Sequence, residues 1–435
     1  MLIIKIRNNK IWPWLLLYTG TTIFIYLFSV SPLFSYSYLT THINMQKCII
    51  CFLLYIITLL CLPKDVKRAS TYLFYLIYLI TYVPTLMYTW MNNEDIRYIV
   101  YLTISILTIE VLIRKFKGIS LSVPHVDHLF LLIFGVYIIS SLFLVIRNGG
   151  INPNTLLISR VSSTREGIEG GVWGYLLNWC AKSFSPMLFA YFAYKKKWLW
   201  VSVVCVIQAL LYFSFGFKAF LFSIALLILI SYVLRKGTDY FRLMPGFFAL
   251  INIISYFFYK FDISKLPLFT FAYRTLFIPA QTQFQYFNFF STNKHLLFSE
   301  GIIGRLFGIK YPYSMPIGYI VNQSVYGANH YSNGNTGIFA YGYADCGLFG
   351  MILASFVLVS IFLIVDGLTK KLPLHIVVAA MSYQMFILND TNILISLNTG
   401  GILWTVLLLI IIDPVISRNN NDSISNNKLL KSILT

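Results

Sequence analysis

The feature that most constrains this chain is a series of long, uninterrupted apolar runs, such as Leu221 to Leu234 (LFSIALLILISYVL). Hydrophobic residues make up 58% of the chain and charged residues only 11%, whereas an ordinary soluble domain is about 25% charged. Such a chain cannot cover itself with a polar surface, which excludes a soluble enzyme, and it is too apolar for intrinsic disorder. Continuous runs also argue against a β-barrel, whose strands alternate polar and apolar residues. We therefore expect an all-α polytopic integral membrane protein.

The apolar runs divide the chain into segments long enough to cross a bilayer, which takes about 20 residues per helix. They predict about 12 transmembrane helices in a single domain, 1–435. The expected ranges are 11–30, 45–62, 70–90, 98–113, 129–146, 172–194, 198–215, 219–234, 243–259, 344–366, 372–388 and 393–413. A tail, 414–435, follows the last helix.

The formal net charge of +18 has a regular distribution. Lys5, Arg7 and Lys10 precede the first predicted helix, and basic clusters follow every second helix after it. The clusters are Lys64, Lys67 and Arg68; Arg114, Lys115 and Lys117; Lys195, Lys196 and Lys197; Arg235, Lys236 and Arg242; and Lys370 with Lys371. Because cytoplasmic loops of membrane proteins are enriched in Lys and Arg, this alternation predicts that both termini and the tail are cytoplasmic. The charge therefore needs no nucleic-acid partner.

The six cysteines do not indicate a metal site or a disulfide framework. Five of them lie in apolar runs, where free cysteine behaves as a small hydrophobic residue. Cys48 and Cys51 form a lone C-x-x-C pair with no matching histidine or second pair. The sequence also has no Asp-x-Asp motif, so we expect no bound metal.

Two predicted outward segments, 147–171 and 260–343, are longer than simple connections and are therefore expected to be functional. The second is rich in aromatic residues, which predicts short helices lying in the membrane interface. Both segments, and the turn at Lys218, carry cations, although Lys and Arg are usually concentrated in the cytoplasmic loops. Those we consider are Arg147, Arg160, Arg165, Lys218 and Arg274. The guanidinium fork of arginine binds phosphate bidentately, although contact with lipid head groups is the alternative for each residue.

The end of the second segment is dense in Gly, Asn and Ser, which favour turns, and it contains His330. A histidine titrates near neutral pH and could act as a general base, although an ordinary loop histidine is the alternative. Asp345 is expected in the first turn of the helix that follows. A carboxylate there is favoured by the helix dipole, so a capping role competes with a substrate contact.

Three segments resemble the Wzy-type O-antigen polymerases of bacterial inner membranes, and the resemblance covers most of the chain. The segments are Ser214–Ser223 (SFGFKAFLFS), Tyr273–Ala280 (YRTLFIPA) and Asn335–Gly350 (NTGIFAYGYADCGLFG). The resemblance implies a glycosyltransferase C-like fold and transfer of a growing glycan from undecaprenyl pyrophosphate to a lipid-linked repeat unit at the periplasmic face. It implies no metal or cofactor, and it names membrane lipids and a Wzz-type chain-length regulator as partners.

On this interpretation the candidate catalytic residues are His330, Arg165 and Arg274. The candidate substrate contacts are Arg147, Arg160, Lys218, Asn335, Thr336, Tyr343 and Asp345. Two alternatives remain. O-antigen ligases usually carry a histidine and a small polar residue before Gly-x-x-Gly, whereas Thr336 and Gly337 stand at that place here. A lipid-linked oligosaccharide flippase would have shorter outer loops and more buried charges.

Overall fold

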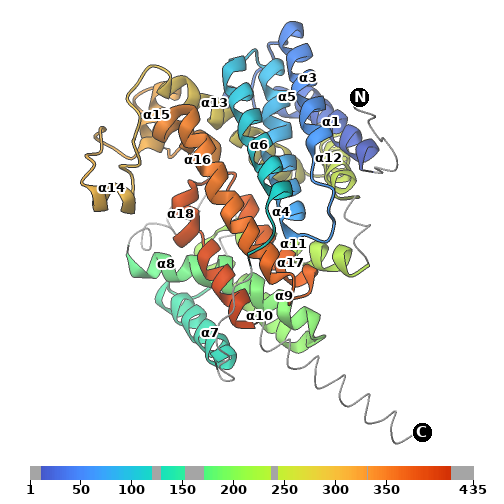
Figure 1. Ribbon diagram of the computed structural model, residues 1–435, viewed down its shortest axis with the longest axis vertical. Helices are drawn as coiled ribbons and strands as arrows, with labels where there is room; N and C mark the ends of the chain where they lie inside the picture. Colours follow the sequence, from blue (N-terminus) through green and yellow to red (C-terminus); the bar gives the residue numbers. More distant parts are fainter. Residues whose placement is uncertain (1–10, 120–128, 152–170, 237–242, 331, 413–435) are drawn as a thin grey trace, which may run out of the picture.

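The computed structural model describes residues 11–119, 129–151, 171–236, 243–330 and 332–412, and its regular structure in these ranges is entirely helical (Figure 1). Seven of the described helices are long and apolar enough to cross a membrane, as expected for a polytopic membrane protein. They are Trp12–Leu33, Ala69–Met91, Ile96–Lys115, Leu129–Arg147, Trp198–Phe215, Ile338–Leu368 and Ile393–Ile412.

The helices occur in the following order along the chain. The first group is α1 (Trp12–Ile25), η1 (Tyr26–Val30), α2 (Ser31–Leu33), η2 (Ser35–Ser37), α3 (Met45–Cys61), α4 (Ala69–Ile77), η3 (Tyr78–Tyr82), α5 (Val83–Met91), α6 (Ile96–Lys115) and α7 (Leu129–Arg147). The middle group is α8 (Val172–Trp179), η6 (Cys180–Phe184), α9 (Ser185–Tyr194), α10 (Trp198–Phe215), α11 (Lys218–Lys236) and α12 (Met244–Lys260). The last group is η8 (Leu268–Phe277), α13 (Ile278–Phe290), α14 (Ile302–Phe307), α15 (Ile317–Tyr326), α16 (Ile338–Leu368), α17 (Leu374–Ile387) and α18 (Ile393–Asn398).

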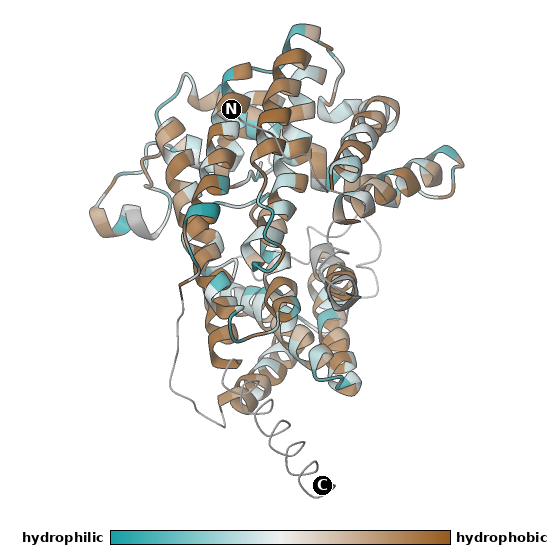
Figure 2. Ribbon diagram, turned by 45° about the vertical axis from the view of Figure 1, so that its right-hand side comes forward, coloured by the Kyte–Doolittle hydropathy of each residue, from teal (hydrophilic) through white to brown (hydrophobic). Residues whose placement is uncertain are grey.

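Each of the twelve ranges predicted from the sequence is largely helical, although only seven contain a helix that meets both the length and the hydropathy needed to cross a bilayer. The number of spans beyond seven therefore stays a prediction. Large apolar side chains are exposed along α3 and α7, and Figure 2 shows that brown, hydrophobic positions recur along the helices. Such faces are expected to contact lipid, because water would not solvate them. The tail 414–435 and most of the segment 147–171 lie outside the described residues.

A π-helical turn precedes four prolines in long described helices; the helix continues well beyond Pro84, Pro186 and Pro279, whereas at Pro32 it ends one residue later, at Leu33. The pairs are η1 with Pro32, η3 with Pro84, η6 with Pro186 and η8 with Pro279. The residue before each proline donates its N–H five residues back, as Val83 does to the Tyr78 carbonyl. Proline lacks an N–H, and its ring crowds the carbonyl four residues earlier. The wider π turn accommodates that ring, so the helices remain continuous.

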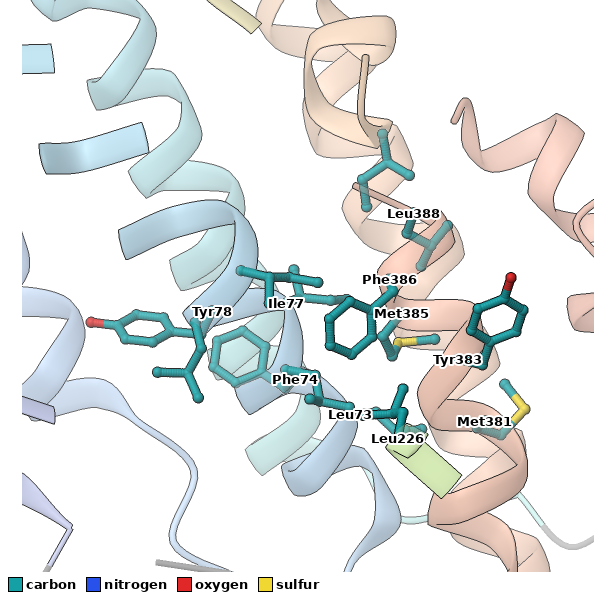
Figure 3. Close-up of a cluster of buried hydrophobic side chains, with 14 of the residues drawn as sticks. Leu73, Phe74, Ile77, Tyr78, Leu226, Met381, Tyr383, Met385, Phe386 and Leu388 are labelled. Carbon is teal, nitrogen blue, oxygen red and sulfur yellow. The ribbon is translucent and has the colours of Figure 1, made fainter. Parts of the chain in front are cut away.

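The helix formed by α4, η3 and α5 is the centre of the fold, since all of its side chains are buried. It packs against α3, α6, α13 and α17. Figure 3 shows Leu73, Phe74 and Ile77 of this helix near Met385 and Phe386 of α17. Because it is apolar and buried all round, this helix belongs to the protein core.

A buried carboxylate at the far end of α16 joins three helices. Asp366 accepts hydrogen bonds from the Ser70 N–H (2.8 Å), the Ser70 hydroxyl (2.6 Å) and Arg68 Nε (2.7 Å), so it caps the beginning of α4. Arg68 also donates to the carbonyls of Ile113 and Phe116 at the end of α6. Its ion pair with Asp366 therefore links α4, α6 and α16.

The predicted cytoplasmic basic segments meet around this ion pair. Lys370 Nζ donates to the carbonyl of Gly118 at 3.1 Å, and the ring of His375 lies 5.3 Å from that of Tyr194, beside the basic segment 195–197. Four of the five basic clusters thus belong to neighbouring parts of the structure. That these segments lie on the cytoplasmic side of the membrane stays a prediction.

The structure differs from the sequence analysis in the segment 260–343. Short helices in the membrane interface were expected there, but η8 and α13 form one continuous helix, Leu268 to Phe290, whose side chains are mostly buried. This helix packs against α5, α12 and α16. Only α14 and α15 lie at the periphery of the bundle (Figure 1).

We expect Arg68→Ala to destabilise the protein by on the order of 3 kcal/mol, because Asp366 would remain buried without its cation. Arg97→Ala is the matched control: its ion pair with Asp95 is exposed, with 63% of the Arg97 side chain accessible, so its loss should cost little stability. Thermal unfolding of both purified variants in detergent measures the difference. Equal losses of stability would show that the Asp366 cluster does not hold the helices together.

Candidate functional site

The buried helix Leu268–Phe290 carries polar side chains along one face. Gln281, Gln285 and Asn288 are spaced at i, i+4 and i+7, which places them on the same side of a helix. Gln283, between them, points elsewhere: its Oε1 accepts from the Tyr98 hydroxyl at 2.8 Å. Arg274 precedes Gln281 by two turns, or about 10 Å along the helix at 1.5 Å per residue.

These amides form one wall of a pocket of about 420 Å³, within the ~300–1,000 Å³ range of small-ligand pockets. We call it the amide pocket. Its principal lining residues are Gln281, Gln285, Asn288, Glu94, Tyr38 and Phe289, and α15 adds Ser324 and Val325. All of these residues come from segments that the basic-loop alternation assigns to the outward side.

Gln281 has an unsatisfied hydrogen-bond acceptor at the amide pocket. Its Nε2 donates to the Ser37 carbonyl at 2.9 Å, but its Oε1 is buried and has no partner in the described part of the chain. Leaving a buried polar atom unpaired costs about 1–3 kcal/mol. Gln285 is better satisfied, since its Nε2 donates to the Tyr326 hydroxyl at 3.2 Å. The side chain of Gln281 also interacts with Tyr88, another residue of the pocket lining.

Glu94 is the acidic group of the amide pocket. Burial raises its pKa to about 7, while a hydrogen bond from the Asn288 side chain and the charge of Lys47 oppose that shift and Asp95 adds to it. Lys47 is held in place by the carbonyls of Asn93 and Glu94, at 2.8 and 2.5 Å from Nζ. Both protonation states of Glu94 are therefore accessible near neutral pH, and each can accept a hydrogen bond from a ligand hydroxyl.

Arg274 lies at the other end of the polar face, beside a second carboxyl group. Its exposed guanidinium lies over the rings of Phe269 and Tyr273, 5.4 and 5.8 Å from their centroids. Asp390 is open to solvent in the turn between α17 and α18, yet it lies deep among protein atoms. The protein atoms around it raise its pKa to about 7, and the positive charge of Arg274 opposes that rise.

The turn 388–390 also holds the N-terminus of α16. Asn389 donates to the Thr275 carbonyl at 3.0 Å, and the Ile338 N–H donates to the Leu388 carbonyl at 3.1 Å. Gly337 is so close that an added Cβ would lie 2.8 Å from the Asn389 carbonyl oxygen. Exposed Asn335 and buried Thr336 therefore stand beside the same turn as Arg274 and Asp390. We call these four residues the Arg274 cluster.

Several residues predicted from the sequence are not placed in this cluster. Arg160 and Arg165 lie outside the described residues, as does the side chain of Lys218. Arg147 ends α7, with its guanidinium 4.4 Å from the ring centroid of Trp173. His330 is exposed; its Nε2 lies 2.7 Å from the Ser332 hydroxyl and its ring packs beside Tyr326, which places it near the amide pocket.

Tyr343 and Asp345 have structural contacts inside α16. The Tyr343 ring packs against Phe287 and His295. Asp345 was expected in the first turn, but the helix begins at Ile338, so it lies about two turns further in. Its Oδ1 accepts from the Phe298 N–H at 3.2 Å and thereby fixes a segment in which Phe298 has a positive φ. The capping role at the helix start is therefore wrong, because sequence hydropathy placed that start too late.

The Gly347-Leu-Phe-Gly350 part of the motif forms a kink in α16. Cys346 and Gly347 leave the helical conformation, and Gly347 has a φ of 60°. The chain closes on itself there, so that a Cβ on Gly350 would lie 1.9 Å from the Gly342 carbonyl oxygen. Only glycine fits at this approach. The motif is thus explained by backbone geometry, without any side-chain chemistry.

Gly350→Ala should therefore destabilise the protein, because the new methyl group would clash with the Gly342 carbonyl oxygen, a backbone atom that cannot move away easily. The matched control is Gly135→Ala in α7, where nothing lies within 4 Å of the added Cβ. Because glycine in a helix is about 0.5–1 kcal/mol less favourable than alanine, this change should stabilise the protein. Thermal unfolding of the two variants should shift in opposite directions. A Gly350→Ala protein as stable as the wild type would contradict the tight kink.

The sequence analysis did not identify Glu94, Gln281, Gln285, Asn288 or Asp390. The heptad-like spacing of the three amides within an aromatic segment is a signal that could have revealed a polar helical face. No comparable signal marks Asp390, because Arg274, the cation near it in the fold, is distant in the sequence.

Among the described residues, no three His, Cys, Asp or Glu side chains come together as a metal site would require, and the absence of a metal requirement stays a prediction. Comparisons with family models, curated proteins and solved structures found no match to this chain.

Proposed function

We propose that this protein polymerises lipid-pyrophosphate-linked oligosaccharide repeat units into O-antigen or a similar polysaccharide at the outward face of a bacterial inner membrane. The observation that carries the proposal is one helix that presents a cation, Arg274, near the carboxyl group of Asp390 and, further along, the amide side chains of a pocket. The first suits a pyrophosphate leaving group, and the second suits a glycan. Both lie in segments predicted to be outward.

Arg274 is the group that would bind the pyrophosphate, because its guanidinium is exposed and offers paired donors to phosphate oxygens. The positive end of the helix dipole at the beginning of α16, beside Asn335 and Thr336, would add to the attraction for an anion. Neutralising the charge that develops on the departing pyrophosphate is the main catalytic effect available to such a site. Arg160 and Arg165 remain candidates for the same role.

Asp390 is the proposed general base. Its carboxylate would accept the proton of the acceptor hydroxyl as the oxygen bonds to the anomeric carbon, while the pyrophosphate leaves with the bonding electrons. A pKa of about 7 leaves a useful fraction of Asp390 ionised at neutral pH. We assign the proton to Asp390 in place of His330, because Asp390 lies beside Arg274 and His330 lies beside Tyr326.

Arg274→Ala should abolish long chains, and Arg274→Lys should leave a sparser ladder, because lysine keeps the charge but loses the paired donors. Losing one such contact in the transition state should cost about 2–4 kcal/mol, or roughly 30- to 1,000-fold in rate. The assay uses purified protein in liposomes, with lipid-linked repeat units and EDTA present. Arg305→Ala, at an exposed arginine of α14, is the control and should be fully active. Normal ladders from Arg274→Ala would exclude the pyrophosphate role.

The polymerisation rate should rise as the pH increases through about 7, because only the deprotonated form of Asp390 can accept a proton. Arg274 is the charged group that faces Asp390 and holds its pKa from rising further. Asp390→Asn should lower the rate at every pH and remove the rise. A wild-type pH profile in Asp390→Asn would show that another group takes the proton.

A deletion strain separates this function from its two alternatives. A lipopolysaccharide gel showing one repeat unit on the core indicates a polymerase, because single units are still exported and ligated. A gel with no repeat unit on the core indicates a ligase or a flippase and contradicts the proposal.

A further inference from the structure

The amide pocket extends away from Arg274: Gln281 at its near end lies about 10 Å along the helix from Arg274, and the outer end is too far away to take part in forming the new bond. Asn288 and Glu94 meet at its outer end, and Asn288 follows Arg274 by fourteen residues, or about 21 Å of helix at 1.5 Å per residue. In the donor of the proposed reaction the pyrophosphate is attached directly to the reacting sugar. The pocket must therefore hold something other than the reacting atoms.

The lining of the amide pocket selects the chemistry of its ligand. Gln285 and Asn288 each offer an amide donor and an acceptor, which matches a hydroxyl group, and the exposed ring of Tyr38 offers an apolar face. The lining as described contains Glu94 and no Lys or Arg, which disfavours a phosphate group. These features together fit a neutral saccharide.

We propose that the amide pocket is a saccharide subsite that holds sugar residues of the glycan chain remote from the bond being formed. The inference rests on the proposed function and assigns different roles to two parts of the site. The Arg274 cluster carries out the transfer, and the amide pocket supplies affinity for the chain. Because both lie on one continuous helix, a glycan must be several sugars long to reach from one to the other.

This arrangement makes affinity depend on chain length. A glycan that reaches the amide pocket gains contacts that a single repeat unit at the Arg274 cluster does not make. Such remote contacts act equally on the bound substrate and the transition state, so they lower KM without changing kcat. Longer chains should therefore be preferred substrates.

The test compares binding of two probes to the full-length protein in nanodiscs by titration calorimetry. The probes are glycans released by mild acid from the strain's own lipid-linked material, one a single repeat unit and the other several repeats long. We expect the longer probe to bind more tightly. Asn288→Ala and Glu94→Gln should each weaken it about 10-fold, as expected for the loss of one good hydrogen bond. Gln323→Ala, on α15 but outside the pocket lining, is the matched control and should bind normally.

Steady-state polymerisation with the same variants gives the second readout. KM for long-chain donor should rise about 10-fold in Asn288→Ala, with kcat unchanged, whereas Arg274→Ala should lower kcat. Ser324→Trp fills the pocket from an exposed position and should reproduce the KM effect without removing an amide. Thermal unfolding checks that each variant is folded.

The outcomes separate this inference from the proposed function. Normal KM and normal glycan binding in Asn288→Ala, Glu94→Gln and Ser324→Trp would overturn the subsite while leaving the polymerase intact. A fall in kcat at unchanged KM would also overturn it, because it would place the pocket in the chemical step. If the wild type binds long glycan through this pocket but forms no polymer, the subsite stands and the polymerase proposal fails.

Discussion

The position of the candidate site depends on how Asp366 holds the opposite end of α16. This carboxylate is only 4% exposed and receives its hydrogen bonds from Arg68 and Ser70, which belong to the start of the central helix. A buried charge is tolerable only when it is paired in this way. With that end fixed, the Gly342–Gly350 contact sets the bend of α16, and its N-terminus reaches the turn at Asn389. The Arg274 cluster is therefore built on a helix anchored at both ends.

The π turns explain how the other half of the site stays on a single element. η8 ends one residue before Ile278-Pro279, and Arg274 lies within it. If the proline ended the helix, Arg274 and the amides of α13 would belong to separate elements with independent motion. The i-to-i+5 bond from Ile278 to Tyr273 keeps the helix continuous through the proline. Arg274 and Gln281 thus keep a fixed separation, which a site for a long substrate requires.

Sequence hydropathy predicted the apolar helices well, because long apolar runs have few alternatives in a membrane protein. It missed the helix Leu268–Phe290 because Gln281, Gln283 and Gln285 lower the local hydropathy. These amides are tolerated inside the bundle because their partners come from elsewhere: Gln283 pairs with Tyr98, and Gln281 with the Ser37 carbonyl. Arg274 could be identified from the sequence because it is a cation in a segment predicted to be outward, where Lys and Arg are usually rare. Asp390 could not, because only folding brings it beside Arg274.

The connections around the site favour group transfer over transport. A flippase exposes its substrate site to the two sides in turn, so the elements that form the site must separate during each cycle. Here the turn 388–390 binds the η8 helix through Asn389 and Thr275, the central helix through Asn389 and Thr81, and the start of α16 through Leu388 and Ile338. Separating any of these elements would leave buried polar groups unpaired, at about 1–3 kcal/mol for each group. A site cross-linked in this way is suited to holding reactants in a fixed geometry, which is what a transfer between two lipid-linked glycans demands.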